Sequence, residues 1–153
     1  MKVICVGWNY PKHNAELGGA EAPAVPTVFC KPDSALLKEN KDFYIPDFSN
    51  QVDYELEVVV RINKLGKSVA EKFAPRYYAQ VALGIDFTAR DMQNEARATG
   101  APWDLCKGFD GSAVIGEFRD FNGDISVVRE GASGRFEAHP VAQKLMEGIN
   151  FRL

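Results

Sequence analysis

The stretch Gln51-Val-Asp-Tyr-Glu-Leu-Glu-Val-Val-Val60 decides the fold, because it places two carboxylates in a segment that otherwise has the composition of a buried β-strand. Successive side chains of a strand alternate between its faces, so Glu55 and Glu57 share one face, with Cα atoms roughly 6.5 to 7 Å apart. The valine run at residues 58–60 is typical of a strand covered on both faces. An acidic face exposed to water is the commoner explanation of such a pair, but half-buried carboxylates need a cation, and a divalent metal with oxygen ligands is a common one.

The composition sets limits on the class of protein. The chain has 153 residues, of which 46% are apolar and 25% charged, as expected for one globular domain. A net charge of -3 with interspersed signs argues against nucleic acid and anionic membranes as partners. No apolar run has the length of a membrane span or the form of a signal peptide, so we expect a cytoplasmic location. Cys5, Cys30 and Cys106 lack metal-ligand spacing, which favours reduced, buried thiols.

A strand is predicted at residues 2–6, and a short helix with Pro11 in its first turn follows it. In that helix His13 and Glu16 would share a face, where the carboxylate can orient the imidazole and raise its basicity. An exposed pair without a function explains this spacing equally well. Residues 18–26 are small and punctuated by proline, which predicts a mobile loop that could serve as a lid.

Further elements follow from local patterns. Residues 27–32 predict a strand, and residues 43–46 a short edge piece, since a proline cannot donate to a sheet. Residues 68–81 predict a helix interrupted near Pro75. Residues 81–87 predict a buried strand.

The buried strand at residues 81–87 has one acid near its end, Asp86, which is a reasonable third oxygen ligand beside Glu55 and Glu57. Thr88 to Asp91 has the form of a capping box, so Asp91 is expected to begin a helix rather than to bind a metal.

Residues 101–112 predict a loop, a strand and a turn that carry one cation, Lys107. By itself such a lysine is more often a surface residue than a substrate clamp.

Five motifs in order resemble the fumarylacetoacetate hydrolase (FAH) family, which is far more specific than any single motif. The resemblance covers about residues 2–116, and residues 117–153 diverge. The motifs are Cys-Val-Gly-Trp-Asn-Tyr-x-x-His-x-x-Glu, Phe-Cys-Lys-Pro-Asp-Ser-Ala, Asp-Tyr-Glu-x-Glu-x-x-Val, Gly-x-Asp-x-Thr-Ala-Arg-Asp and Pro-Trp-x-x-x-Lys-x-Phe-Asp.

The resemblance implies a mostly β member of the α+β class, a mixed β-roll or sandwich of the FAH catalytic-domain type. A single domain over residues 1–153 and a homodimer are expected. The family's Gly-Asp-x-Ile-x-Thr-Gly-Thr-Pro stretch is absent, so we expect some C-terminal strands to be missing. Trp8 stands where the family commonly has arginine.

The resemblance also implies a role for each candidate residue. Mg²⁺ or Mn²⁺ would be held by three acids, an acid/base dyad would act beside them, and two lysines would face a small anionic 2-oxo acid. The three acids are Glu55, Glu57 and Asp86, and the acid/base dyad is His13 and Glu16. Of the two lysines, Lys107 is the substrate-side cation and Lys31 belongs to the substrate-binding wall.

The implied function is hydrolysis of C–C bonds in 2-oxo or 1,3-dicarbonyl acids of the acylpyruvate or fumarylpyruvate type. The metal would stabilise an enolate while His13 activates water. Three alternatives stay open: oxaloacetate decarboxylation, isomerisation or hydration of 2-oxo acids, and a catalytically inactive metal-binding homologue.

Overall fold

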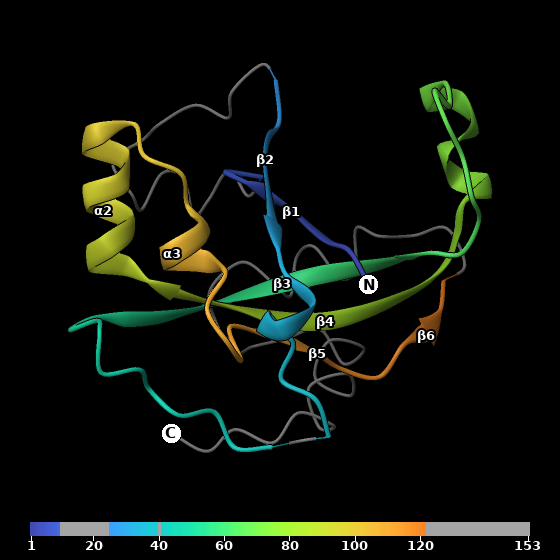
Figure 1. The fold of residues 1–153 in the computed structure, drawn as a ribbon. Helices are drawn as coiled ribbons and strands as arrows, with labels where there is room; N and C mark the ends of the chain where they lie inside the picture. Colours follow the sequence, from blue (N-terminus) through green and yellow to red (C-terminus); the bar gives the residue numbers. More distant parts are fainter. Residues whose placement is uncertain (10–24, 40, 122–153) are drawn as a thin grey trace. The chain divides into compact units, whose positions relative to one another are not determined.

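The structure is a computed structural model that describes residues 1–9, 25–39 and 41–121 (Figure 1). Most residues of its elements lie in strands, so the expected mostly β member of the α+β class is confirmed. His13, Glu16 and the helix expected around them lie outside the described residues, as does nearly all of the expected loop. The elements are β1 (Val3–Gly7), β2 (Thr27–Lys31), the 3-10 helix η1 (Asp33–Ala35), β3 (Val52–Ile62), the 3-10 helix η2 (Glu71–Arg76), β4 (Tyr78–Ala89), α2 (Arg90–Thr99), α3 (Asp104–Lys107), β5 (Ala113–Ile115) and β6 (Arg119–Asp120).

The chain divides into two compact units. Of the described residues, the first unit takes in Met1–Glu55 and Ile85–Val114, and the second takes in Leu56–Gly84 and residues 115–121. Among the described candidates for site residues, Glu57 alone lies in the second unit. The single domain expected over residues 1–153 stays a prediction.

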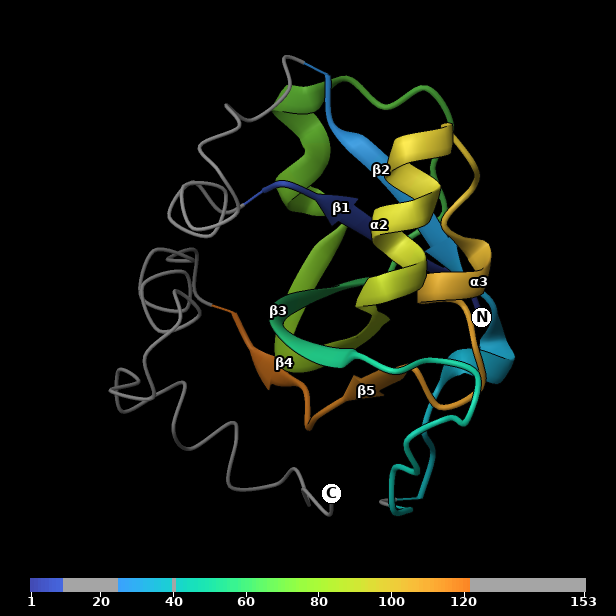
Figure 2. The same ribbon diagram turned by 90° about the vertical axis from the view of Figure 1, so that its left-hand side faces the viewer.

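In the first unit β1 and β2 form an antiparallel pair in which Val3 faces Lys31 and Gly7 faces Thr27. Burial alternates along both strands, so one face of the pair is covered while Ile4 and Val28 on the other are exposed. The alternation ends with Lys31 buried at the close of β2. Helices α2 and α3 contact each other, and α3 contacts β2 (Figure 2). The β1–β2 pair therefore places the Lys31 side chain in the interior of the first unit.

Strand β4 is buried from Val81 to its end, as expected for an apolar strand covered on both faces. It lies between β3 and β5 in the strand order, and β6 pairs with its first part. Within the first unit the ring of Phe87 stacks on that of Phe43, with centroids 3.7 Å apart. Asp86 is thus held in the buried part of a strand and not at its end.

Backbone hydrogen bonds and strand pairing connect the segments of the second unit with one another. Asn63 donates its backbone N–H to the carbonyl of Tyr77, and Gln80 pairs with Asp120 between β4 and β6. A Cβ on Gly66 would lie 2.7 Å from the Tyr77 ring, so a larger residue there would displace that ring.

Four local predictions differ from the structure. Residues 101–112 contain the short helix α3 where a strand was expected. Residues 68–81 do not form the expected α-helix: they contain the short 3-10 helix η2, and strand β4 begins at Tyr78. Pro75 cannot donate a helical hydrogen bond, which disfavours a longer helix there. Residues 43–46 form no strand, and Phe43 packs on the core instead. Thr88 does not cap a helix, since α2 begins at Arg90 without a side-chain cap.

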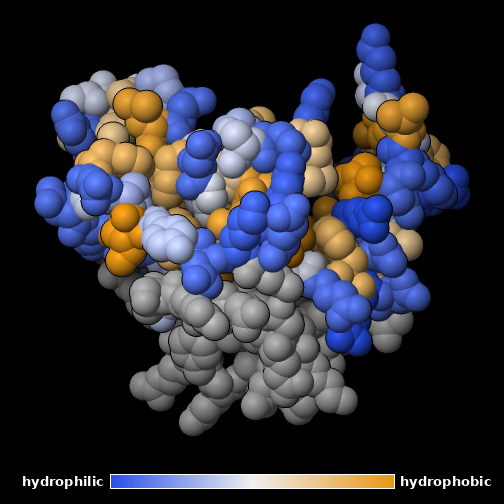
Figure 3. Space-filling model, turned by 60° about the horizontal axis from the view of Figure 1, so that its bottom comes forward, coloured by the Kyte–Doolittle hydropathy of each residue, from blue (hydrophilic) through white to orange (hydrophobic). Residues whose placement is uncertain are grey.

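Exposed apolar side chains are interspersed with hydrophilic ones on the face drawn in Figure 3. Exposed apolar side chains, such as those of Leu65 and Tyr44, are normal for a folded chain. None of the helices in the described ranges has the length and hydropathy needed to cross a bilayer.

Candidate active site

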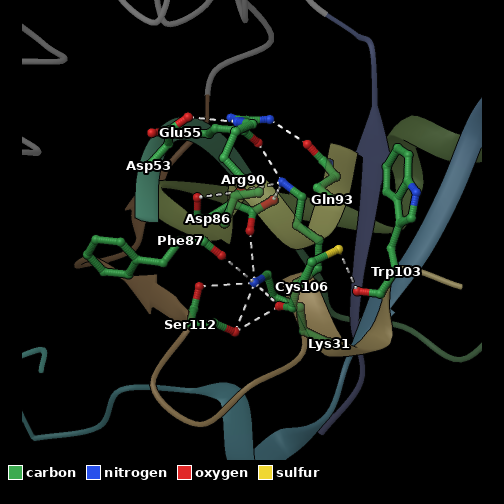
Figure 4. A network of polar contacts seen from close by, with 12 residues as sticks. Lys31, Asp53, Glu55, Asp86, Phe87, Arg90, Gln93, Trp103, Cys106 and Ser112 are labelled. Carbon is green, nitrogen blue, oxygen red and sulfur yellow. Dashed lines mark hydrogen bonds and ion pairs between the residues drawn. The ribbon is translucent and has the colours of Figure 1, made fainter. Parts of the chain in front are cut away.

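A chain of alternating charges runs through the interior of the first unit (Figure 4). Its members come from five elements and one loop, so the fold gathers them from positions far apart in the sequence. They are Lys31 at the end of β2, Asp53 and Glu55 on β3, Asp86 and Thr88 on β4, Arg90 and Gln93 on α2, Lys107 at the end of α3, and Ser112 in the turn before β5.

Lys107 lies at the centre of this chain. Its side chain is 3% exposed, and Nζ lies 2.6 Å from Glu55 Oε2 and 2.7 Å from Asp86 Oδ2. The same nitrogen donates to Thr88 Oγ1 at 2.6 Å. One buried ammonium therefore joins two carboxylates, and Lys107 is not the surface lysine that its local sequence favours.

Lys31 contacts the other oxygen of Asp86, with Nζ 2.8 Å from Oδ1. This contact is an ion pair only, because Asp86 Oδ1 accepts no hydrogen bond within the described residues. Lys31 donates instead to Ser112, to Oγ at 2.9 Å and to the carbonyl oxygen at 3.0 Å, and also to the carbonyl of Lys107. Burial lowers the pKa of Lys31, and the neighbouring Asp86 opposes that change in part.

Arg90 holds the opposite side of Glu55. Its Nε lies 2.7 Å from Asp53 Oδ2, one Nη lies 2.5 Å from Glu55 Oε1, and the other Nη donates to the Gln93 side chain. Burial lowers the pKa of Arg90, but Asp53 and Glu55 outweigh this effect and the net change is upward.

Glu55 is kept ionised by its neighbours. Burial opposes ionisation, but Lys107 and Arg90 together outweigh it, so the pKa of Glu55 is lowered. Both of its oxygens face cations, which is the arrangement that a buried carboxylate requires.

The donor set suits a divalent ion with oxygen ligands. One nitrogen lies within 2.7 Å of oxygens from two buried carboxylates, so a small cation can be shared by Glu55 and Asp86 at that place. Asp86 Oδ1 already faces the Lys31 ammonium at 2.8 Å, so an ion bound there would share this oxygen with Lys31. Glu57 occupies the next same-face position on β3 and is half-buried.

No group of three or more His, Cys, Asp or Glu side chains forms a metal site within residues 1–9, 25–39 and 41–121. The assignment of Glu55, Glu57 and Asp86 as the ligands of Mg²⁺ or Mn²⁺ therefore stays a prediction. The structure does bring together Lys31, Glu55, Asp86 and Lys107. The roles of His13 and Glu16 stay predictions too, since both lie outside the described residues.

The sequence interpretation missed five residues of this network, among them Asp53, which pairs with Arg90. Arg90 and Gln93 are buried in α2, and Thr88 and Ser112 are fully buried beside the two lysines. The sequence does contain a signal from which Arg90 and Gln93 could have been found. An arginine directly after an apolar strand, followed three residues later by glutamine, places two polar side chains on one helix face next to a buried acid.

The three cysteines are free thiols, as expected. Cys106 is buried and donates to the carbonyl of Trp103 at 3.3 Å, and burial raises the pKa of its thiol. Contrary to the expectation that all three are buried, Cys5 is half-buried and Cys30 is exposed. Cys30 lies on the uncovered face of β2.

The family described as fumarylacetoacetate (FAA) hydrolase C-terminal matches residues 2–135. The chain therefore belongs to the fumarylacetoacetate hydrolase family, and its fold is of the type expected from the motifs. The match extends beyond residue 116, where the motif resemblance ends.

Individual relatives agree with this placement. The chain is 38% identical over 116 residues to the mitochondrial oxaloacetate tautomerase FAHD1 of Bos taurus, covering 76% of this chain and 52% of the relative. It is 35% identical to the oxaloacetate tautomerase YcgM of Escherichia coli, covering 80% of this chain and 57% of the relative. The chain thus spans about half the length of the curated relatives that it matches.

A solved structure shares the fold. The fumarylpyruvate hydrolase from Pseudomonas aeruginosa, in complex with Mn²⁺ and pyruvate, superposes with a TM-score of 0.71 at 34% identity. The match covers 77% of this chain and 52% of that structure.

Proposed function

We propose that the chain carries the site of an enzyme that converts 2-oxo acids through their enol or enolate form, with tautomerisation of a 2-oxo acid as the reaction. The observation that carries the proposal is the buried Lys107 ammonium between Glu55 and Asp86. Support for the reaction type comes from the relatives named oxaloacetate tautomerase.

Tautomerisation needs a proton acceptor and a proton donor. The C–H bond next to the keto group breaks, a C=C bond forms, and the former keto oxygen gains the proton. His13, oriented by Glu16, is the proposed base for the carbon proton. The Lys107 ammonium is the proposed cation at the oxygen, where negative charge develops.

The acids have a separate task in this proposal. Glu55, Glu57 and Asp86 would hold Mg²⁺ or Mn²⁺, which supplies Lewis-acid polarisation of the keto oxygen when bound. The solved fumarylpyruvate hydrolase that carries Mn²⁺ and pyruvate supports this choice. Arg90 keeps Glu55 oriented and ionised from the other side.

C–C hydrolysis of acylpyruvates is the second candidate, and the likeness to a fumarylpyruvate hydrolase favours it. Here water adds to the distal carbonyl, the C–C bond breaks, and the electron pair remains on the pyruvate part as an enolate that then takes a proton. The two reactions share the enolate but differ in the attack by water.

One set of assays tests both candidates. The full chain is given oxaloacetate and an acylpyruvate with Mn²⁺ and with a chelator, and tautomer interconversion, C–C cleavage and decarboxylation are followed separately. Tautomerisation that needs the metal and falls about 10² to 10⁴-fold in His13→Ala supports the proposal. Turnover of none of these substrates, despite metal binding, favours an inactive metal-binding homologue.

A further inference from the structure

Arg97 lies on the same face of α2 as the site residues Arg90 and Gln93. The three positions are spaced by three and four residues, which places them along one side of an α-helix. Arg97 is thus about two turns beyond Arg90, in the last turn of the helix. This face of α2 therefore carries Arg90, which contacts Glu55, near one end and a second cation, Arg97, near the other.

Two tryptophans surround the guanidinium of Arg97. Its Cζ lies 5.3 Å from the ring centroid of Trp8 and 5.6 Å from that of Trp103. The two rings meet edge to face, with centroids 5.4 Å apart. Both distances fall within cation–π range, so the rings fix the plane and position of the guanidinium.

No acid neutralises Arg97 within the described residues. Its side chain forms no ion pair and no hydrogen bond there, and Nε is buried without a partner. Arg90, by contrast, has both Asp53 and Glu55. Burial and the positive charge of Arg90 lower the pKa of Arg97, and Glu55 opposes this change in part.

The backbone beside Trp8 is adapted to this arrangement. Trp8 has φ of 53°, a left-handed conformation that is costly for a bulky residue. A Cβ on Gly7 would lie 3.3 Å from the Trp103 ring, so a side chain there would press on that ring. Strain of this kind persists where surrounding contacts hold the residue in place, and it gathers at ligand sites.

The nearby carboxylates of the first unit are already engaged. Asp53, Glu55 and Asp86 contact Arg90, Lys107 and Lys31, which leaves Arg97 as the cation without an anion among the described residues of the cluster. A buried donor without a partner is costly, and a planar guanidinium matches a carboxylate with two parallel hydrogen bonds.

We propose that Arg97, held between Trp8 and Trp103, binds the second carboxylate of a dicarboxylic 2-oxo acid and makes the site selective for 2-oxo diacids over 2-oxo monoacids. The inference rests on the proposed function, because the first carboxylate and the keto group are assigned to the site around Glu55, Asp86 and Lys107. It adds the residue that selects the substrate by its second carboxylate.

The experiment compares two five-carbon acids that differ only in the second carboxylate, 2-oxoglutarate and 2-oxopentanoate. Their dissociation constants are measured with Mn²⁺ by calorimetry and by tryptophan fluorescence. The chain has two tryptophans, and both lie beside Arg97, so the fluorescence reports on this place alone. The proteins are the full chain, Arg97→Gln, Arg97→Lys and a control, Arg76→Gln. Arg76 also stacks on an aromatic ring, with Cζ 4.8 Å from the centroid of Phe73, but is exposed.

The unaltered chain should bind the diacid about 10- to 100-fold more tightly than the monoacid. Arg97→Gln should abolish this preference and leave the monoacid affinity unchanged, Arg97→Lys should keep part of it, and Arg76→Gln should keep all of it. Equal affinities in the unaltered chain, or equal weakening of both acids in Arg97→Gln, would overturn the inference. Diacid preference without turnover would support the inference and reject the proposed function, whereas failure to bind either acid would overturn both.

Discussion

At the scale of single residues, Lys107 decides the properties of the site. Its buried ammonium contacts two carboxylates and a hydroxyl, so its positive charge balances the two negative charges inside the first unit. A local sequence pattern cannot reveal this, because the partners Glu55 and Asp86 lie 52 and 21 residues away. The family resemblance identified Lys107 as a cation of the site, although the residue by itself favours a surface position.

Lys107→Met should lower the free energy of unfolding by about 3–5 kcal/mol, because it leaves two buried carboxylates without their shared cation. Urea denaturation followed by circular dichroism measures the change. Lys38→Met is the matched control, because Lys38 pairs with Asp33 at the surface, where water screens the interaction and its contribution to stability is small. Equal effects of the two substitutions would show that the buried arrangement does not exist.

The lowered pKa of Glu55 predicts a loss of stability in acid. A carboxyl whose pKa is lower in the folded state stabilises the fold above its ordinary pKa of 4.5, and this contribution is lost as pH falls through the folded value. The free energy of unfolding, measured in urea from pH 7 to pH 3, should therefore decline less steeply in Glu55→Gln. Parallel declines would mean that Glu55 has the same pKa in the folded and unfolded chain.

At the scale of elements, the sequence predicts what local patterns determine. The strands expected at residues 2–6, 27–32 and 81–87 are confirmed, because alternating or continuous apolar side chains specify them. The start of α2 was assigned wrongly as a capping box. Asp91 does lie in the first helical turn. Its carboxylate, however, accepts hydrogen bonds from Ser49 and Asn50, which lie more than 40 residues earlier in the chain. A local sequence motif cannot predict such long-range contacts.

Ser49 ties the segment before β3 to the start of α2. Its hydroxyl donates to Asp91 at 2.6 Å, and the side chain is buried. Ser49→Ala should therefore lower the free energy of unfolding, since a part-buried hydrogen bond to a charged group is lost. The exposed Ser34→Ala should change it by less than about 0.5 kcal/mol. The comparison is made by urea denaturation, and a neutral Ser49→Ala would argue against this link.

At the scale of the whole molecule, the family is established while the activity is proposed. The match over residues 2–135 places the chain in the fumarylacetoacetate hydrolase family, yet the chain spans about half of its curated relatives. The sequence predicted four residues that the structure gathers in one network, and it missed Asp53 and the four buried residues Arg90, Gln93, Thr88 and Ser112. The burial of these four depends on contacts between distant elements. The homodimer and the cytoplasmic location stay predictions.

The central claim is that the carboxylates of Glu55 and Asp86, which are paired with Lys107 in this structure, belong to the binding site of a divalent ion. A crystal structure of the chain grown with Mn²⁺ and oxalate tests this claim most directly, because manganese is located by anomalous scattering and oxalate stands in for the enolate of a 2-oxo acid. We expect one manganese peak bound by Glu55, Glu57 and Asp86, with Lys107 Nζ moved away from the position between Glu55 and Asp86. Manganese bound elsewhere, with Lys107 still joining Glu55 to Asp86, would contradict the account.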